Sequence, residues 1–201
     1  MGSVTLRIKM SLKLTIILGT KRVDNKSQFV ARHIARIAES TGDWEVTYVD
    51  PADLNLPGDG NDDIAKDPKF TKITEESEAF FLVTPEYNHS FPGTLKRVLD
   101  SELANFIHKP VAVAGVSAGR YGGVRAVAHL AQVVRELGMV MSSVDVNISD
   151  SYNAYNAETD EPNEGHEYIE SSVKVALDEL KWLAESLKYG RDHLPNKFHD
   201  K

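Results

Sequence analysis

The chain has 201 residues, of which 41% are hydrophobic and 26% charged, the balance of an ordinary globular domain. Its formal net charge of −7 argues against a nucleic-acid or membrane-surface partner, and no apolar run reaches the roughly 18 residues that a membrane span needs. There is no cysteine, which excludes disulfides and thiolate chemistry and fits a reducing cytoplasm.

The first eleven residues are basic but have no continuous apolar core, so we do not expect a signal peptide. Two interpretations of this segment remain open. Residues 1–9 are an extension before a native start at Met10, or the alternation from Leu6 to Leu14 lengthens the first strand.

Short apolar runs alternate with amphipathic patterns along the chain, which is typical of buried parallel strands separated by helices. We predict strands at residues 13–18, 44–49, 78–84, 111–116 and 139–148, and helices at 27–39, 91–102, 122–137 and 167–189. Residues 50–72 and 149–165 read as long polar loops, the first with room for one helical turn, and residues 190–201 as a frayed tail.

Strands that alternate with helices throughout predict a single α/β domain over residues 1–201. Its five-stranded parallel sheet should be doubly wound, with helices on both faces and the flavodoxin-like strand order 2-1-3-4-5. In such a sheet the loops after strands one, three and four meet at one edge, where ligands bind.

The first of these loops runs from Gly19 to Ser27 and is basic within an acidic protein. It opens a helix, whose free amides and dipole favour an anion. The Thr20 and Ser27 hydroxyls and the forked Arg22 side chain suit a phosphate. The alternative is that Ser27 only caps the helix and the basic side chains are solvated. The loop matches neither the Walker A pattern nor Gly-x-Gly-x-x-Gly.

The second loop, residues 84–93, follows a strand and precedes a helix, and two prolines and a glycine fix its shape. It leaves Tyr87, Asn88 and several backbone amides facing the crevice, unless it is only a rigid turn. The third loop, residues 117–123, has three glycines that let the backbone approach a flat ligand. Arg120 in this loop either meets a second anion or is a surface residue. The three loops together predict a planar, phosphorylated cofactor, for which FMN is well suited.

The same loops resemble signatures of the NADPH-dependent FMN reductase family, whose members include chromate, quinone and azo-dye reductases. The resemblance spans residues 14–148. It is carried by Thr84-Pro85-Glu86-Tyr87-Asn88-His89-Ser90-Phe91-Pro92-Gly93-Thr94-Leu95-Lys96, by Ser117-Ala118-Gly119-Arg120-Tyr121-Gly122-Gly123-Val124-Arg125-Ala126 and by Gly19-Thr20-Lys21-Arg22. Two features depart from the family pattern: five steps separate Arg22 from Ser27, where some members have three, and Arg97 and Leu99-Asp100-Ser101 replace the usual residues after Lys96.

The resemblance implies an FMN-dependent oxidoreductase that takes hydride from NADPH or NADH and passes electrons to a quinone, flavin, azo or metal acceptor by ping-pong kinetics. It also implies a homodimer or homotetramer with the site near the subunit contact. No side chain is needed as a catalytic acid or nucleophile, and no metal is expected. The predicted cofactor-binding residues are Gly19, Thr20, Arg22, Ser27, Pro85, Glu86, Tyr87, Asn88, Ser117, Gly119, Arg120 and Gly122.

Other functions remain as alternatives. A flavodoxin-type electron carrier would bind FMN without accepting hydride, although the Thr-Gly repeat of flavodoxin phosphate loops is absent here. A regulatory module would have lost FMN. The sequence does not identify the physiological acceptor or choose between NADH and NADPH. Tyr152 and Tyr155 either close over a neighbouring site or pack, and we favour packing; we interpret the acidic loops as solvated surface.

Overall fold

The computed structural model describes residues 11–195. The open question about residues 1–9 and the last part of the predicted tail, residues 196–201, therefore lie outside the described part of the chain.

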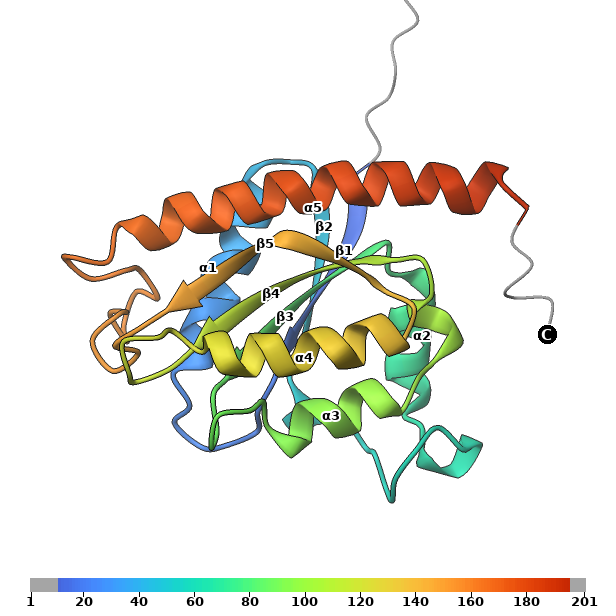
Figure 1. Ribbon diagram of the computed structural model, residues 1–201, viewed down its shortest axis with the longest axis horizontal. Helices are drawn as coiled ribbons and strands as arrows, with labels where there is room; N and C mark the ends of the chain where they lie inside the picture. Colours follow the sequence, from blue (N-terminus) through green and yellow to red (C-terminus); the bar gives the residue numbers. More distant parts are fainter. Residues whose placement is uncertain (1–10, 196–201) are drawn as a thin grey trace, which may run out of the picture.

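Five parallel strands form one sheet in the order β2-β1-β3-β4-β5, which confirms the predicted flavodoxin-like topology (Figure 1). Each predicted strand is present, with ends that differ by one or two residues at most. The strands are β1 (Leu12–Leu18), β2 (Trp44–Val49), β3 (Ala79–Pro85), β4 (Pro110–Val116) and β5 (Val140–Ile148).

Helices cover both faces of the sheet and enclose two hydrophobic cores (Figure 1). One face carries α1 (Ser27–Ser40) and α5 (Tyr168–His193), and the other carries α2 (Pro68–Glu76), α3 (Gly93–Asp100) and α4 (Val124–Glu136). Phe80 and Phe81 are neighbours in β3 and fully buried, yet they belong to opposite cores. Because successive side chains of a strand point to opposite faces, a sheet buried on both faces has nearly continuous apolar strands.

Helix α2 corrects the prediction that residues 50–72 are a loop. Asp67 caps this helix, because its Oδ1 accepts hydrogen bonds from the amides of Lys69 at 2.8 Å and Phe70 at 3.3 Å. Pro68 occupies the first helical position, where its missing amide hydrogen costs nothing. Phe70 is fully buried against the sheet. The capped start and the buried Phe70 together hold this helix in a polar segment.

Helix α5 also corrects the predicted tail, since it continues past Tyr189 to His193. Two contacts hold its end against the edge of the sheet where the strands begin. Lys188 Nζ lies 2.8 Å from Glu78 Oε1, and Arg191 Nη1 donates to the His108 carbonyl oxygen at 2.7 Å. None of the helices within residues 11–195 has both the length and the hydropathy needed to cross a membrane.

Candidate functional site

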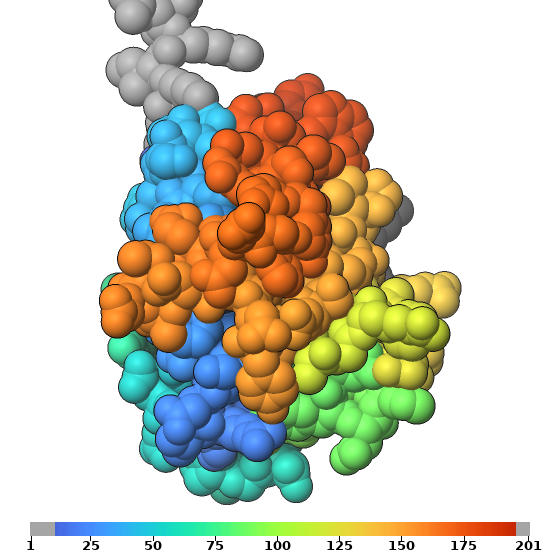
Figure 2. Space-filling view, turned by 90° about the vertical axis from the view of Figure 1, so that its left-hand side faces the viewer, coloured from blue at the N-terminus to red at the C-terminus, as the bar shows by residue number. Residues whose placement is uncertain are grey.

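A pocket of about 480 Å³ opens at the carboxyl ends of β1, β3, β4 and β5. Figure 2 views the molecule from this side. Four chain segments line the pocket. The first is residues 22–27, the second is Pro85, Glu86 and Tyr87, the third is Val116, Ser117 and Ala118, and the fourth is Ser151 and Tyr152.

The first segment is packed tightly onto β3 at its start. The Gly19 amide donates to the Val83 carbonyl oxygen at 2.7 Å, and a Cβ atom at Gly19 would lie only 2.8 Å from that oxygen. Thr20 is buried, its Oγ1 lies 3.1 Å from the Tyr87 hydroxyl, and it accepts from the Arg22 amide at 3.2 Å. Gly19 and Thr20 therefore support the pocket from beneath and do not line it.

The start of α1 forms one wall of the pocket and is suited to an anion. Lys26 is the N-cap residue and supplies no side-chain hydrogen bond, whereas Ser27 is already the first helical residue. Asn25 instead shapes this turn, because its side chain accepts from the Gln28 amide and donates to the Arg22 carbonyl oxygen, both at 2.9 Å. The remaining first-turn amides, the helix dipole and two basic side chains favour negative charge here.

The second segment leaves β3 and turns sharply. The Glu86 amide donates to the Val116 carbonyl oxygen at 2.9 Å, which ties this turn to the third segment. Tyr87 and Ser90 exchange two backbone hydrogen bonds of 2.8 and 3.0 Å, and Asn88 and His89 have φ values of 51° and 66°. This tight turn carries Asn88 out into solvent, so the structure does not place Asn88 in the pocket wall.

Glu86 lies in the pocket wall, but its carboxylate is buried and neutralised. Its side chain is 5% exposed, and Oε1 lies 2.7 Å from Nε and 2.5 Å from Nη2 of Arg125 on α4. Its other oxygen, Oε2, is buried and has no hydrogen-bond partner among residues 11–195. The ion pair joins the turn after β3 to α4 and keeps an uncompensated negative charge away from the pocket.

The third segment brings Ser117 and Ala118 to the pocket but not the rest of the predicted loop. The Ser117 hydroxyl donates to the Gly119 carbonyl oxygen at 2.9 Å and accepts from the Gly123 amide at 3.2 Å. Gly122 has a φ of 58° and packs on the backbone of β5, where a Cβ atom would lie 2.8 Å from the Asn147 carbonyl carbon. Gly119, Arg120 and Gly122 thus form the turn that leads into α4.

Arg120 is a surface residue that stacks on its neighbour. Its guanidinium lies over the Tyr121 ring, 5.0 Å from the centroid, and Nη2 lies 3.0 Å from the Tyr121 hydroxyl. Arg120 is not among the residues that line the pocket.

The fourth segment comes from the loop after β5, for which the sequence favoured packing over a position near a site. The Ser151 amide donates to the Ser117 carbonyl oxygen at 3.1 Å, which draws the chain after β5 against the third segment. Tyr152, interpreted from the sequence as a packing residue, is 67% exposed and lines the pocket. Tyr155 does pack, since it is buried with its ring 5.6 Å from that of His33.

Six of the twelve predicted cofactor-binding residues line the pocket: Arg22, Ser27, Pro85, Glu86, Tyr87 and Ser117. Thr20 contacts Tyr87 from behind, and Gly19, Asn88, Gly119, Arg120 and Gly122 shape or flank the loops. The pocket is therefore basic where α1 begins and has apolar surface from Pro85, Tyr87 and Val116.

Comparisons with known proteins identify the family of the chain. Residues 12–153 match the family described as NADPH-dependent FMN reductase. A 2-hydroxy-1,4-benzoquinone reductase from Burkholderia sp. is 31% identical over 141 residues, which cover 66% of this chain and 75% of that protein. A quinone reductase from Escherichia coli K12 is 33% identical over 147 residues, covering 66% and 76% respectively.

A solved structure shows the same architecture. FerB, a flavoenzyme NAD(P)H:(acceptor) oxidoreductase from Paracoccus denitrificans, superposes with a TM-score of 0.69 at 26% sequence identity. The superposition covers 85% of this chain and 98% of FerB.

Proposed function

The chain belongs to the NADPH-dependent FMN reductase family, and on that premise we propose that it passes electrons from NAD(P)H, through FMN, to a small quinone-like acceptor. The reaction balances as NAD(P)H, a proton and a quinone giving NAD(P)⁺ and a hydroquinone. The observation that carries the proposal is the pocket, which is basic at one end and has apolar surface beside it.

The residues of the pocket fit a flat ring that carries one phosphate. At the basic end, Arg22, Lys26 and Ser27 would hold the phosphate, because the first turn of α1 has no side-chain cap from Lys26. Pro85, Tyr87 and Val116 would border the ring, and the backbone of Glu86 and Ser117 would provide polar contacts at its edge. Asp24 and the neutralised Glu86 are the acidic residues of this wall.

FMN, when bound, supplies the chemistry of hydride acceptance and release. The chain's own residues would bind and orient the reactants and exclude water. The Thr20–Tyr87 contact and the Ser117 bonds hold the walls in place before any ligand arrives, so little reorganisation is needed. Donor and acceptor would use the same mouth in turn, which gives ping-pong kinetics.

The proposal also includes a homodimer or homotetramer acting in the cytoplasm, where NAD(P)H is available. Tyr121 and Val124, next to the third segment, are 52% and 44% exposed, and exposed apolar side chains near a site suit a subunit contact. Light scattering during size-exclusion chromatography measures the mass directly. A purely monomeric protein at micromolar concentration would contradict this part of the proposal.

Anaerobic mixing of the FMN-loaded protein with NADPH tests the main proposal. We expect the visible flavin absorbance to bleach and to return when a quinone is added. Retention of FMN without bleaching by NADPH or NADH would favour an electron carrier. A protein that does not bind added FMN would favour a flavin-free module.

A further inference from the structure

Tyr152 is an exposed aromatic residue with no partner of its own. Its side chain is 67% exposed, and no hydrogen bond, ion pair or ring contact involves it within residues 11–195. Tyr121 and Tyr189, the tyrosines closest to it in exposure, differ in this respect, because their rings lie against Arg120 and His193. A bare aromatic ring at the edge of a pocket is poorly explained by packing.

The backbone on both sides of Tyr152 is held firmly. On one side, the Ser151 amide is bonded to the Ser117 carbonyl oxygen. On the other, the amides of Asn153 and Ala154 donate to the Asp150 carbonyl oxygen at 2.9 and 3.0 Å, and Ala154 is fully buried. The ring is therefore presented to the pocket by a fixed turn, in which Asp150 has a φ of 49°.

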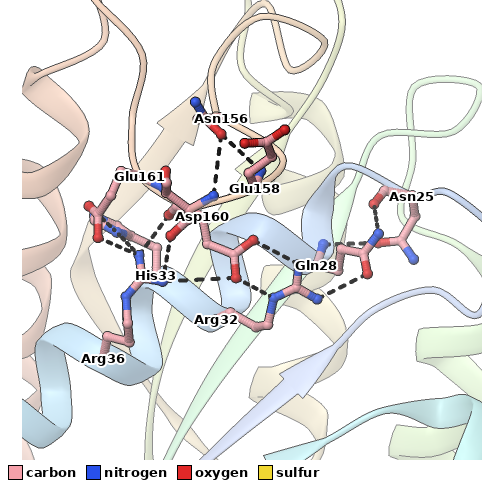
Figure 3. Close-up of polar contacts among 10 residues, drawn as sticks. Asn25, Gln28, Arg32, His33, Arg36, Asn156, Glu158, Asp160 and Glu161 are labelled. Carbon is pink, nitrogen blue, oxygen red and sulfur yellow. Dashed lines mark hydrogen bonds and ion pairs between the residues drawn. The ribbon is translucent and has the colours of Figure 1, made fainter.

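Farther along, the same loop is fastened to α1 by a cluster that we call the clasp, formed by Arg32, Arg36, Asp160 and Glu161 (Figure 3). Arg32 donates hydrogen bonds to both carboxylate oxygens of Asp160, from Nε at 2.7 Å and from Nη2 at 2.8 Å. Arg36 donates to the Asp160 carbonyl oxygen at 2.7 Å and to Glu161 Oε1 at 2.9 Å. Since α1 also forms the basic wall, the clasp fixes the fourth segment relative to the first.

Tyr152 is far more exposed than the buried residues assigned to the cofactor. Ser27 is 1% exposed and Pro85 is also buried, whereas Tyr152 lies at the mouth, where a diffusing reactant arrives. In Figure 2 the orange atoms of this loop lie between the blue first segment and the yellow-green third segment. The ring can thus meet a second flat molecule without displacing the residues beneath it.

We propose that Tyr152 is the side chain on which the electron acceptor stacks, and that it gives the protein a preference for acceptors with a flat conjugated ring over compact acceptors without a ring. This inference rests on the proposed function. It assigns to Tyr152 a role in acceptor specificity, with no part in holding FMN or in accepting hydride from NAD(P)H.

The test compares FMN-loaded wild type with Tyr152→Ala, Tyr152→Phe and the control Tyr189→Ala, whose tyrosine is 62% exposed on α5. The first measurement is the Kd of anthraquinone-2-sulfonate for the oxidised protein, by calorimetry without NAD(P)H. The second is KM for 1,4-benzoquinone and for ferricyanide, a compact acceptor without a ring.

We expect Tyr152→Ala to weaken anthraquinone-2-sulfonate binding and raise the benzoquinone KM by about three- to tenfold. The KM for ferricyanide in Tyr152→Ala should stay within about twofold of the wild-type value. In Tyr152→Phe and Tyr189→Ala, the Kd and both KM values should also stay within about twofold of the wild type. An unchanged Kd for anthraquinone-2-sulfonate in Tyr152→Ala, or equal increases in KM for benzoquinone and ferricyanide, would overturn the inference.

Two further measurements distinguish a failure of this inference from a failure of the proposed function. A weaker FMN Kd or an altered visible spectrum in Tyr152→Ala would mean that the ring contacts the cofactor, and would overturn the acceptor assignment. If NADPH does not bleach the wild type, the proposed function fails, yet the calorimetric comparison still decides whether Tyr152 binds a flat aromatic molecule.

Discussion

Arg22 is an exposed basic side chain at the proposed phosphate end of the pocket, and its neighbour Lys21 lies outside that pocket. We expect Arg22→Ala to weaken FMN binding roughly 10- to 100-fold, since hydrogen bonds to charged groups contribute about 1.5–3 kcal/mol. Fluorescence titration of the flavin-free protein measures this Kd.

Riboflavin, which lacks the phosphate, provides the internal control for Arg22. Its affinity should be unchanged in Arg22→Ala, and Lys21→Ala should bind both flavins like the wild type. Equal weakening of FMN and riboflavin would show that Arg22 supports the fold of the loop and does not hold the phosphate.

Gly122 and Gly119 form a matched pair for stability. Gly122→Ala should lower the free energy of unfolding by about 1–3 kcal/mol, because the new Cβ would lie 2.8 Å from the β5 backbone and φ is positive. A Cβ at Gly119 would meet no atom within 4 Å, so Gly119→Ala should change the stability by less than about 0.5 kcal/mol. Urea unfolding of both variants measures these changes. Similar losses of unfolding free energy in the two variants would contradict the close packing of Gly122 on β5.

At the scale of elements, the clasp between α1 and the loop after β5 joins residues more than a hundred positions apart. Asp160→Asn leaves Arg32 without its ionic partner and should loosen this loop. Because the Arg32 side chain is 41% exposed, the global cost should be small, about 1 kcal/mol or less.

Hydrogen exchange followed by mass spectrometry checks the effect of Asp160→Asn. Peptides that cover residues 150–165 should exchange several-fold faster, while those from the centre of α5 should not change. Asp192→Asn, which removes an ion pair at the exposed end of α5, is the control. Uniformly faster exchange across the chain would mean that the clasp supports the whole fold.

Most elements could be predicted from the sequence because their signals are local. The strands are continuous apolar runs, and the stripes of α1, α4 and α5 follow the helical period. Helix α2 was missed because a single fully buried aromatic, Phe70, anchors it in a polar segment. Its start signal, Asp67-Pro68, was present and would have identified it.

Three of the four segments that line the pocket could be predicted because their sequence signals are also local. The first three segments carry recognisable motifs, and the sheet order brings them together. Ser151 and Tyr152 carry no motif, and only tertiary contacts to Ser117 and from α1 bring them to the pocket. Loops 84–93 and 117–123 both contribute residues to the pocket, but turn geometry decides which of their residues line it.

For the whole molecule, His33 should make stability depend on pH. It is 3% exposed, and burial lowers its pKa, although Glu161 opposes this shift. The unfolded chain takes up a proton near pH 6.5, while the buried imidazole resists it. Stability should therefore fall as the pH drops below about 6.5. Between pH 7 and 5.5 this residue should account for at most about 1 kcal/mol.

Urea unfolding at the two pH values, for the wild type and His33→Gln, isolates this contribution. The glutamine keeps a hydrogen-bond acceptor for Arg36, whose Nη2 lies 3.2 Å from His33 Nδ1. The difference in unfolding free energy between the two pH values should be smaller in His33→Gln than in the wild type. His89→Gln, at an exposed position, controls for loss of a histidine. Parallel pH profiles for His33→Gln and the wild type would refute the prediction.

The contacts of α5 with Glu78 and His108 place the end of this helix at the edge of the sheet opposite the pocket. An electrode, bead or fusion partner attached beyond His193 would accordingly leave the mouth facing solution. Immobilisation through that end should preserve access for dissolved reactants, whereas attachment through residues near Tyr152 would obstruct it.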